Sequence, residues 1–220
     1  MGVSIAHQRG VIEALKDKDL STVVLRAMLM KSTHVPGHDD SFVSDISADE
    51  ATGGTYARVT LSGVTVAQDD ANDRVTLDFN DPTFSSPASA QDIIGMEVYM
   101  QVGADDSTPA DDALVAFIGF GGATVAGLTR ATRTITLSVT AATAGIAAGD
   151  RIQLHGNANG NDGTYTVASV SGSDVVVNEA IGGAADGGGG TVYELFAATG
   201  NNIDVTMATP VMTFDMTPAT

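Results

Sequence analysis

The sequence contains no cysteine and no tryptophan, and aromatic residues make up only 5% of its 220 residues. Without cysteine there is no disulfide framework and no thiolate chemistry, and the chain suits assembly in a reducing cytoplasm. With so few aromatic side chains, the hydrophobic core must be built mainly from valine, isoleucine, leucine, alanine and methionine. We therefore expect an aliphatic core that no covalent cross-link supports.

Basic residues are also scarce, since 10 lysines and arginines stand against 27 aspartates and glutamates, for a formal net charge of −17. Arg151 is the only basic residue after residue 133. Nucleic-acid binding depends on lysine and arginine displacing counterions, so we exclude DNA and RNA as partners. An acidic surface also keeps a protein soluble, which is the simplest interpretation of the charge. A basic partner surface and a salty medium are the alternatives.

Long apolar runs are absent too, and none approaches membrane-spanning length. The first twenty residues include Glu13 and the charged stretch Lys16–Asp19, which argues against a signal peptide. Ala6 stands where a myristoylation motif requires serine or threonine, so we reject that motif. We expect no membrane partner.

The most informative segment is Tyr56–Phe79, in which apolar and polar residues alternate with a period of two. Such alternation buries one face of a strand and leaves the other in water, as in antiparallel sheets. The polar bridge Gln68–Asp73 has the length and composition of a hairpin connection. The alternating apolar positions are Val59, Leu61, Val64, Val66, Val75, Leu77 and Phe79.

Four other segments of the first half predict regular structure. The spacing of apolar residues over residues 4–15 predicts a short N-terminal helix. A β-branched apolar run over residues 23–30 predicts a buried strand, and residues 93–102 predict a longer one. Residues 113–120 are almost continuously apolar, which indicates either the centre of a sheet or a subunit contact. Residues 42–46 predict a short helix or turn.

The composition changes near Leu128, where short strands joined by connectors rich in glycine, alanine and asparagine begin. Strands at this spacing can close into a small barrel or sandwich. Clean alternation returns after residue 202. We therefore predict a mainly β chain with an antiparallel sandwich or barrel-like core and a short N-terminal helix, formed by residues 1–128 and 196–220. A small all-β domain, residues 129–195, is inserted into it. Its predicted strands are Ile135–Val139, Arg151–Leu154, Thr164–Val170, Val175–Val177 and Thr191–Leu195.

Candidate metal ligands do not converge in the sequence. His34 and His38 are separated by Pro36-Gly37, which prevents the helical face that would bring both rings to one ion. The loop Asn157–Gly163 has the composition of a calcium loop, but its glycine comes one place late and Ala168 stands where a glutamate is required. A tight hairpin explains this loop better.

Two acidic pairs and the remaining histidines complete the search for ligands. Asp105-Asp106 and Asp111-Asp112 flank Pro109, and we interpret them as solvated loop residues. His7 and His155 have no partner near them in the sequence. We assign no metal-ligating residue.

No motif of a catalytic or phosphate-binding site is present. The sequence has no G-x-S-x-G elbow, no Walker glycine-lysine motif and no dinucleotide fingerprint. The run Gly187–Gly190 lacks the lysine and the following helix that a phosphate cradle needs. We therefore assign no catalytic and no cofactor-binding residue, and we expect neither a cofactor nor an enzyme.

Five segments carry, in order, a resemblance to a known family: STVVLRAMLM, HDDSFVSDIS, GGTYARVTL, VTVAQDDANDRVTLDFNDPTFSS and VYMQVGADDSTPADDALVAFIGF. This order resembles that of tailed-bacteriophage virion structural proteins of the head-decoration or cement type. The hairpin Asp69–Val75 is its most specific part. Residues 129–195, with GDRIQLHGNANGNDGTYTVASVSGSDVVVNE, separately resemble a small β module inserted or appended in phage structural proteins.

The resemblance implies a capsid decoration protein on the outside of the virion, assembled in the host cytoplasm. Its implied partners are the major capsid protein or other virion proteins, and further copies of itself as a homo-oligomer. The sequence leaves monomer, dimer and trimer open. The alternative is a neck, tail or fibre component whose inserted domain adheres to the host surface. A degradative enzyme carried on the virion would need a carboxylate pair that the sequence does not single out.

Overall fold

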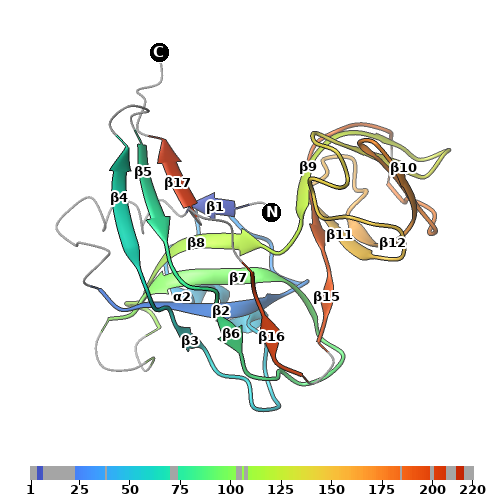
Figure 1. Cartoon of the computed structure of the whole chain (residues 1–220). Helices are drawn as coiled ribbons and strands as arrows, with labels where there is room; N and C mark the ends of the chain where they lie inside the picture. Colours follow the sequence, from blue (N-terminus) through green and yellow to red (C-terminus); the bar gives the residue numbers. More distant parts are fainter. Residues whose placement is uncertain are drawn as a thin grey trace.

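The chain folds into two β-rich parts that lie side by side, which we call the body and the barrel (Figure 1). The body holds a six-stranded sheet, two small sheets and the short helix α2 (Val43–Ile46), and the barrel is a closed ring of strands. The predicted fold class, mainly β with an antiparallel sandwich or barrel-like core, is confirmed. The computed structural model describes residues 4–6, 23–37, 39–69, 74–102, 106, 109–183, 185–198, 201–206 and 212–215.

The six-stranded sheet forms the centre of the body. Its strands follow the order β1-β8-β7-β2-β3, and β15 also pairs with β7. All of its pairs are antiparallel. Its strands are β1 (Ser4–Ala6), β2 (Leu25–Lys31), β3 (Val59–Thr60), β7 (Asp92–Met100), β8 (Ala113–Gly119) and β15 (Phe196–Ala197). Since β8 lies between β1 and β7, the first interpretation of residues 113–120, the centre of a sheet, is confirmed.

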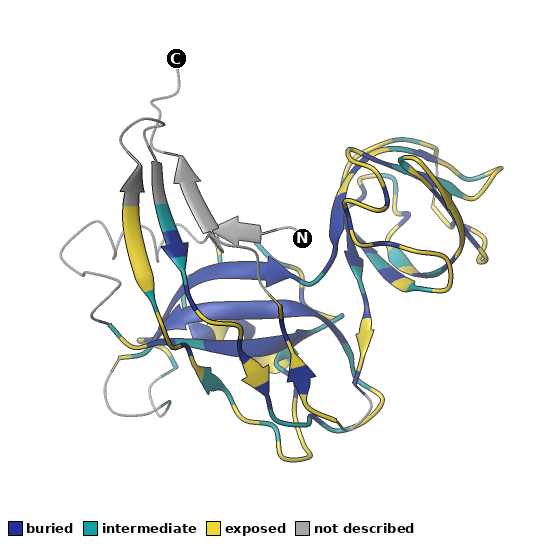
Figure 2. Cartoon of the chain, in the orientation of Figure 1, coloured by how far each residue is buried: buried dark blue, intermediate teal, exposed yellow. Residues whose placement is uncertain are grey.

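The middle strands of this sheet are buried on both faces (Figure 2). On one face, Leu29 and Val98 join a cluster that the small sheets cover. On the other face, Met28, Tyr99 and Phe117 pack beneath α2 and against the barrel. A strand that is covered on both faces has no wet side, so its sequence is apolar at nearly every position. This explains why the middle strands do not alternate as the hairpin strands do.

The small sheets return the end of the chain to the body. One has the order β17-β5-β4, and in it the predicted hairpin forms with Thr65 opposite Asp78 and Asp69 opposite Arg74. The connecting residues 70–73 lie outside the described residues. The other small sheet pairs β16 with β6. These strands are β4 (Thr65–Asp69), β5 (Arg74–Asp78), β6 (Thr83–Phe84), β16 (Ile203–Asp204) and β17 (Met212–Asp215).

The barrel closes in the order β10-β13-β12-β11-β14-β9 around its own aliphatic core. It begins at Gly122, before the boundary at residue 129 that the sequence indicated. Strand β9 was missed because glycine, alanine and threonine leave few large apolar side chains to mark its alternation, although Val125 and Leu128 point into the core. The barrel strands are β9 (Gly122–Thr129), β10 (Thr134–Leu137), β11 (Arg151–His155), β12 (Gly163–Ser171), β13 (Asp174–Val177) and β14 (Thr191–Glu194).

The barrel is inserted at a break in one strand position of the body sheet. Strand β8 ends with Gly119 opposite Gly95 of β7, and the Phe120 amide continues the pattern with a 3.1 Å hydrogen bond to the Ile94 carbonyl. When the chain returns, β15 places Phe196 opposite Ile93 of β7. Because β2 occupies the other side of β7, β15 continues the position that β8 left. The chain thus leaves and re-enters the sheet at neighbouring points.

One part of the prediction for the N-terminus is wrong. Ser4–Ala6, placed at the start of a helix by the sequence, form strand β1 and pair with β8. A short isolated helix is only marginally stable in water, so backbone hydrogen bonding to β8 outweighs the helical tendency of these residues. The rest of that predicted helix lies outside the described residues. The predicted helix or turn at residues 42–46 is confirmed as α2. Within the described residues, no helix combines the length and apolarity needed to cross a membrane.

Candidate functional site

Polar side chains gather at three places in the described residues. The first is a hollow on the body beside α2, the second is the junction between body and barrel, and the third is a set of loops on the barrel. No group of three or more histidine, aspartate or glutamate side chains that could hold a metal ion occurs among the described residues. What each of the three places can do therefore depends on its hydrogen bonds and charges.

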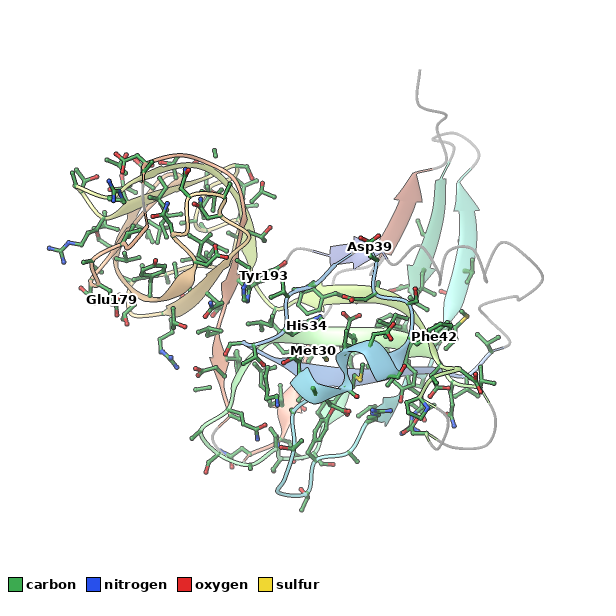
Figure 3. All side chains as sticks on the ribbon, turned by 180° about the vertical axis from the view of Figure 1, so that it is seen from behind. Met30, His34, Asp39, Phe42, Glu179 and Tyr193 are labelled. Atoms are coloured by element: carbon green, nitrogen blue, oxygen red, sulfur yellow. The ribbon has the colours of Figure 1, made fainter. Side chains whose placement is uncertain are left out.

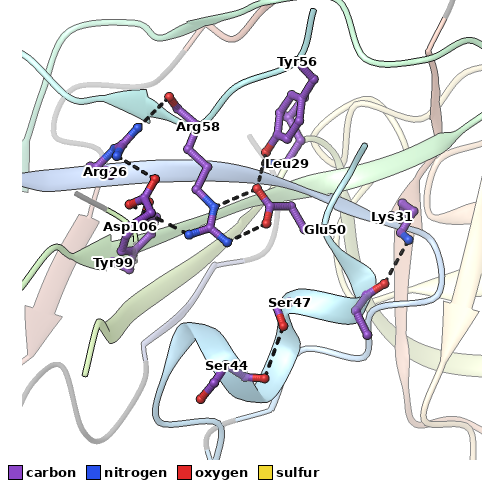
Figure 4. Close-up of polar contacts among 11 residues, drawn as sticks. Arg26, Leu29, Lys31, Ser44, Ser47, Glu50, Tyr56, Arg58, Tyr99 and Asp106 are labelled. Carbon is purple, nitrogen blue, oxygen red and sulfur yellow. Dashed lines mark hydrogen bonds and ion pairs between the residues drawn. The ribbon is translucent and has the colours of Figure 1, made fainter. Parts of the chain in front are cut away.

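The hollow has a volume of about 540 Å³ and is lined by two arginines, two carboxylates and a tyrosine (Figure 4). Arg58 forms a two-pronged ion pair with Glu50, with Nε–Oε1 and Nη2–Oε2 distances of 2.8 and 2.6 Å. Arg26 Nη1 lies 2.6 Å from Asp106 Oδ2, and its Nη2 donates to the Arg58 carbonyl oxygen. Each arginine thus faces a carboxylate at hydrogen-bond distance, and the charges of the hollow balance.

Two tyrosines complete this network. The Tyr56 hydroxyl donates to Glu50 Oε1 at 3.0 Å and accepts the Leu29 amide at 2.9 Å. The Tyr99 hydroxyl donates to Asp106 Oδ1 at 2.8 Å. Burial raises the pKa of both tyrosines well above the ordinary value, so neither supplies a phenolate at neutral pH. The tyrosine protons hold the carboxylates in place and are not available to a reacting group.

Arg58 is the member of the network with most partners. Its guanidinium carbon lies 5.5 Å from the centre of the Tyr99 ring, a cation–π distance. Hydrogen bonding to Glu50 is the main cause that raises the pKa of Arg58. Arg26 Nε, in contrast, is buried and has no hydrogen-bond partner among the described residues. The hollow is a charge-balanced network that fastens the loop at Asp106 to the sheet.

The junction contains a histidine and a glutamate that are almost completely buried. His34 Nε2 lies 3.1 Å from Glu97 Oε1, with exposed fractions of 1% for His34 and 0% for Glu97. Glu97 belongs to β7 and stands between Met28 and Phe117 on the neighbouring strands. The His34 ring also packs on Phe117 at 5.5 Å. This pair was not predicted from the sequence, although Glu97 is the one charged residue in the run Ile93–Met100.

Aromatic side chains continue this layer into the barrel (Figure 3). Tyr193 of β14 meets Phe117 edge to face, with ring centres 5.6 Å apart. On its other side, the His155 ring centre is 6.0 Å from that of Tyr193, and His155 Nε2 donates to the Ser32 carbonyl oxygen at 3.2 Å. Burial lowers the pKa of His155 and raises that of Tyr193 to about 12. Both rings are therefore neutral at neutral pH, as an apolar contact between body and barrel requires.

The loops of the barrel are held by their own amides. Asp162 accepts the Asn157 amide at 2.7 Å through Oδ1 and the Gly156 amide at 2.9 Å through Oδ2. Asn161 Nδ2 donates to Asn157 Oδ1, and the Asn161 carbonyl accepts the Tyr165 hydroxyl. These contacts are those of the tight turn that the composition predicted. Asn161 Oδ1 is buried, and no described residue forms a hydrogen bond with it.

The glycine run of the barrel packs along a strand. The Gly187 and Gly189 amides donate to the carbonyls of Leu128 and Val125 on β9. Gly190 has a φ of +83°, and a Cβ there would lie 2.5 Å from the His155 carbonyl oxygen. Glycine is thus required by close approach of two backbones and not by a phosphate group.

The interpretation of the acidic pairs as solvated is wrong for two of their members. Asp106 is paired in the hollow. Asp112 is completely buried, accepts the Val102 amide at 2.7 Å, and has a pKa that burial raises. Both hold the loop between β7 and β8 onto the sheet. Asp111 is exposed as expected, whereas Asp105, His7 and His38 lie outside the described residues.

The polar groups in these three places make structural contacts with one another. The arginines and carboxylates of the hollow are paired, the junction joins two cores, and the amides of the barrel loops are hydrogen-bonded within the barrel. None of the three brings together a nucleophile, a base and a free donor, the arrangement that a reaction would require, among the described residues. No known protein family matches the chain, and no curated protein is similar enough to match it.

Proposed function

We propose that this chain is a structural subunit of a tailed-phage virion, and specifically a decoration or cement protein on the outside of the head. Two sequence observations support the proposal: the resemblance centred on the hairpin Asp69–Val75, and the net charge of −17, which suits an exterior position in water. The polar clusters add support because their charged groups are committed to holding the fold.

The observation that carries the proposal is the insertion of the barrel at a break in the body sheet. Each part has its own hydrophobic core. In this proposal the body attaches to the capsid, and the barrel extends from it as a second surface. Two neighbouring chain connections join the barrel to the body. Together with the Tyr193–Phe117 contact and the Arg151–Asp92 ion pair, they hold the barrel in one orientation. A subunit that covers a lattice needs such a fixed shape more than it needs a reactive group.

Repetition supplies the strength of attachment in this proposal. A single weak contact between body and capsid dissociates readily, but contacts repeated by the symmetry of the head act together. Exposed apolar side chains such as Val24, Val35 and Phe196, which come from different segments of the chain, could make such weak contacts.

The test is to locate and count the protein in purified particles. The expected result is a copy number close to that of the major capsid protein, with density for the barrel on the outside of the head. Removing the gene should remove these copies from the head. The particles should then be less resistant to heat or low salt. Particles that lack the protein, or that carry it only at the tail, would overturn the head assignment.

A second candidate function is adhesion through the barrel. The loops that end β9 and precede β14 are tied together by Arg130, which contacts Asp186 and the Gly183 carbonyl. Strand β9 carries these loops away from the body over about 25 Å, taking roughly 3.3 Å for each residue of a strand. Such a surface, displayed at the end of a rigid module, is where a host receptor would bind.

Deleting the barrel separates the two functions. Removing residues 121–195 and joining Phe120 directly to Phe196 keeps one continuous strand opposite Ile94 and Ile93 of β7. We expect this variant to bind heads as the full chain does if decoration is its role. Adsorption to host cells should then be unchanged, whereas a loss of adsorption with intact particle binding would favour the adhesion function.

A further inference from the structure

Strand β4 is an exposed edge of the body. Among the described residues it pairs with β5 alone, and it is the outer strand in the order β17-β5-β4. Thr65, Val66 and Ala67 are all exposed, and Val66 is 38% accessible. Within the described part of the chain, the backbone amides and carbonyls on one side of this strand therefore have no strand partner.

Among the residues that the structure describes, this edge lacks the features that usually protect such strands. Edge strands are commonly blocked by lysine, proline, a bulge or a covering loop. The sequence of β4 is Thr-Val-Ala-Gln-Asp, with one charge at its end and neither lysine nor proline. It pairs with β5 without a register shift, and the neighbouring Leu77 is completely buried. The strand is thus held in place by β5 on one side, and no described strand pairs with it on the other.

We propose that β4 pairs with β4 of a second copy of this chain, antiparallel and about a twofold axis at Ala67. This arrangement places Ala67 opposite its own symmetry mate and Thr65 opposite Asp69 of the other copy. The small, exposed Ala67 side chain allows close approach of the two strands at the axis. Twofold pairing of identical surfaces is the commonest form of self-association.

Other registers are less favourable. An axis at Asp69 would place two carboxylates opposite each other, and like charges in opposite positions destabilise a sheet. An axis at Val66 or Gln68 would leave one end of the five-residue strand without a partner from β4. The axis at Ala67 uses all five residues and places no acid opposite an acid.

The same register covers an exposed apolar side chain. Val66 stands opposite Leu77, so the two share a face of the sheet, yet Leu77 is buried and Val66 is not. In the dimer Val66 would lie opposite Gln68 of the other copy and diagonal to its Val66. The two three-stranded sheets would become one sheet of six strands. This inference rests on β4 alone and holds whether or not the protein decorates a head.

One strand edge buries less than the roughly 1,200 Å² typical of stable complexes, so the free dimer is weak and is best captured covalently. The chain has no cysteine, which makes a single introduced cysteine unambiguous. In the full-length protein, Ala67→Cys would place two sulfurs across the axis, where opposite Cα atoms lie about 4.5 to 5.5 Å apart. Thr65→Cys is the matched control, because its two copies would be about 13 Å apart. Thr60→Cys, on exposed edge strand β3, controls for random collision.

The variants are oxidised in a glutathione buffer and the dimer fraction is measured by intact mass, after circular dichroism has confirmed their folding. We expect at least tenfold more dimer for Ala67→Cys than for either control. Mixing Thr65→Cys with Asp69→Cys chains should also give the mixed dimer in excess over both self-dimers. Equal dimer fractions for the three single variants would overturn the proposal.

Discussion

His34 and Glu97 are 63 residues apart in sequence, yet their side chains meet at 3.1 Å in the layer between body and barrel. Both are almost fully buried, and apolar or aromatic side chains surround them. Removing charged or polar groups from water is costly, so such a pair is stable only while each member has its partner. The pair therefore links the start of the loop after β2 to the middle of β7.

Removing one partner should destabilise the protein strongly. We expect His34→Ala to lower the free energy of unfolding by about 3 kcal/mol, because it leaves Glu97 buried without this partner. The measurement is urea denaturation followed by circular dichroism. The double variant His34→Leu with Glu97→Leu is the control, since it removes both polar groups and keeps most of the volume. A double variant less stable than His34→Ala would show that packing, and not the missing partner, causes the loss of stability.

Arg58→Lys should be much more costly than Arg151→Lys. Arg58 holds Glu50 with two parallel hydrogen bonds, and their side chains are 14% and 12% exposed, whereas that of Arg151 is 46% exposed in its pair with Asp92. Lysine keeps the charge but loses the planar fork. We expect a loss of about 1 to 3 kcal/mol for Arg58→Lys and under about 1 kcal/mol for Arg151→Lys. Equal losses in thermal or urea unfolding would contradict the assignment of the hollow as a structural network.

His155 should make the protein less stable as the solution is acidified. Burial lowers its pKa below the ordinary 6.5, so the unfolded chain binds a proton that the folded chain does not. The contribution of His155 to stability should therefore be fully present above pH 6.5. It should decrease as the pH falls from 6.5 toward the pKa of the folded state. Measuring urea unfolding between pH 7.5 and 5 checks this, with His155→Gln expected to flatten the curve.

Glu194 provides a comparison of opposite sign. Burial raises its pKa above 4.5, so the folded chain keeps a proton that the unfolded chain has lost. Its contribution is present below pH 4.5 and fades as the pH rises through the folded pKa. Glu194→Gln should thus change the slope in the reverse direction to His155→Gln. If both variants left the pH dependence of stability unchanged, burial would not be shifting the pKa of either group.

Gly95 should not tolerate a side chain. A Cβ at this position would lie 2.4 Å from the Ile118 carbonyl oxygen and 2.6 Å from the Phe117 ring. Gly95→Ala should therefore destabilise by about 1 to 3 kcal/mol, because overpacking forces the neighbours to shift. Gly127→Ala on β9 is the matched control, since its nearest atom is 3.7 Å away. A Gly95→Ala protein as stable as the control would show that β7 and β8 can separate without cost.

Local patterns in the sequence were sufficient for most strands but not for their partners. The alternation of Val66 and Leu77 predicted the hairpin because both strands are near in sequence and one face is wet. Strand β9 was missed because its small residues carry little hydrophobic contrast. Ser4–Ala6 were assigned to a helix because their partners in β8, residues 116–118, are far away in the sequence, and no local pattern encodes that pairing.

The polar clusters were less predictable still. Asp106 and Asp112 have the sequence surroundings of solvated loop residues, and only the fold places them against arginine or beneath a backbone amide. Glu97 did carry a signal, since a lone acid in a buried strand requires a partner. The identity of that partner depends on where the chain turns after β2, which the sequence leaves open.

The break between Gly119 and Phe196 has a practical consequence. Because β15 continues along β7 from the point where β8 ends, the inserted barrel can be exchanged for another domain without altering the order in which the body strands pair. A guest domain whose own two ends lie close together would meet the same geometric demand. The body thus offers a ready position for grafting enzymes, antigens or affinity reagents.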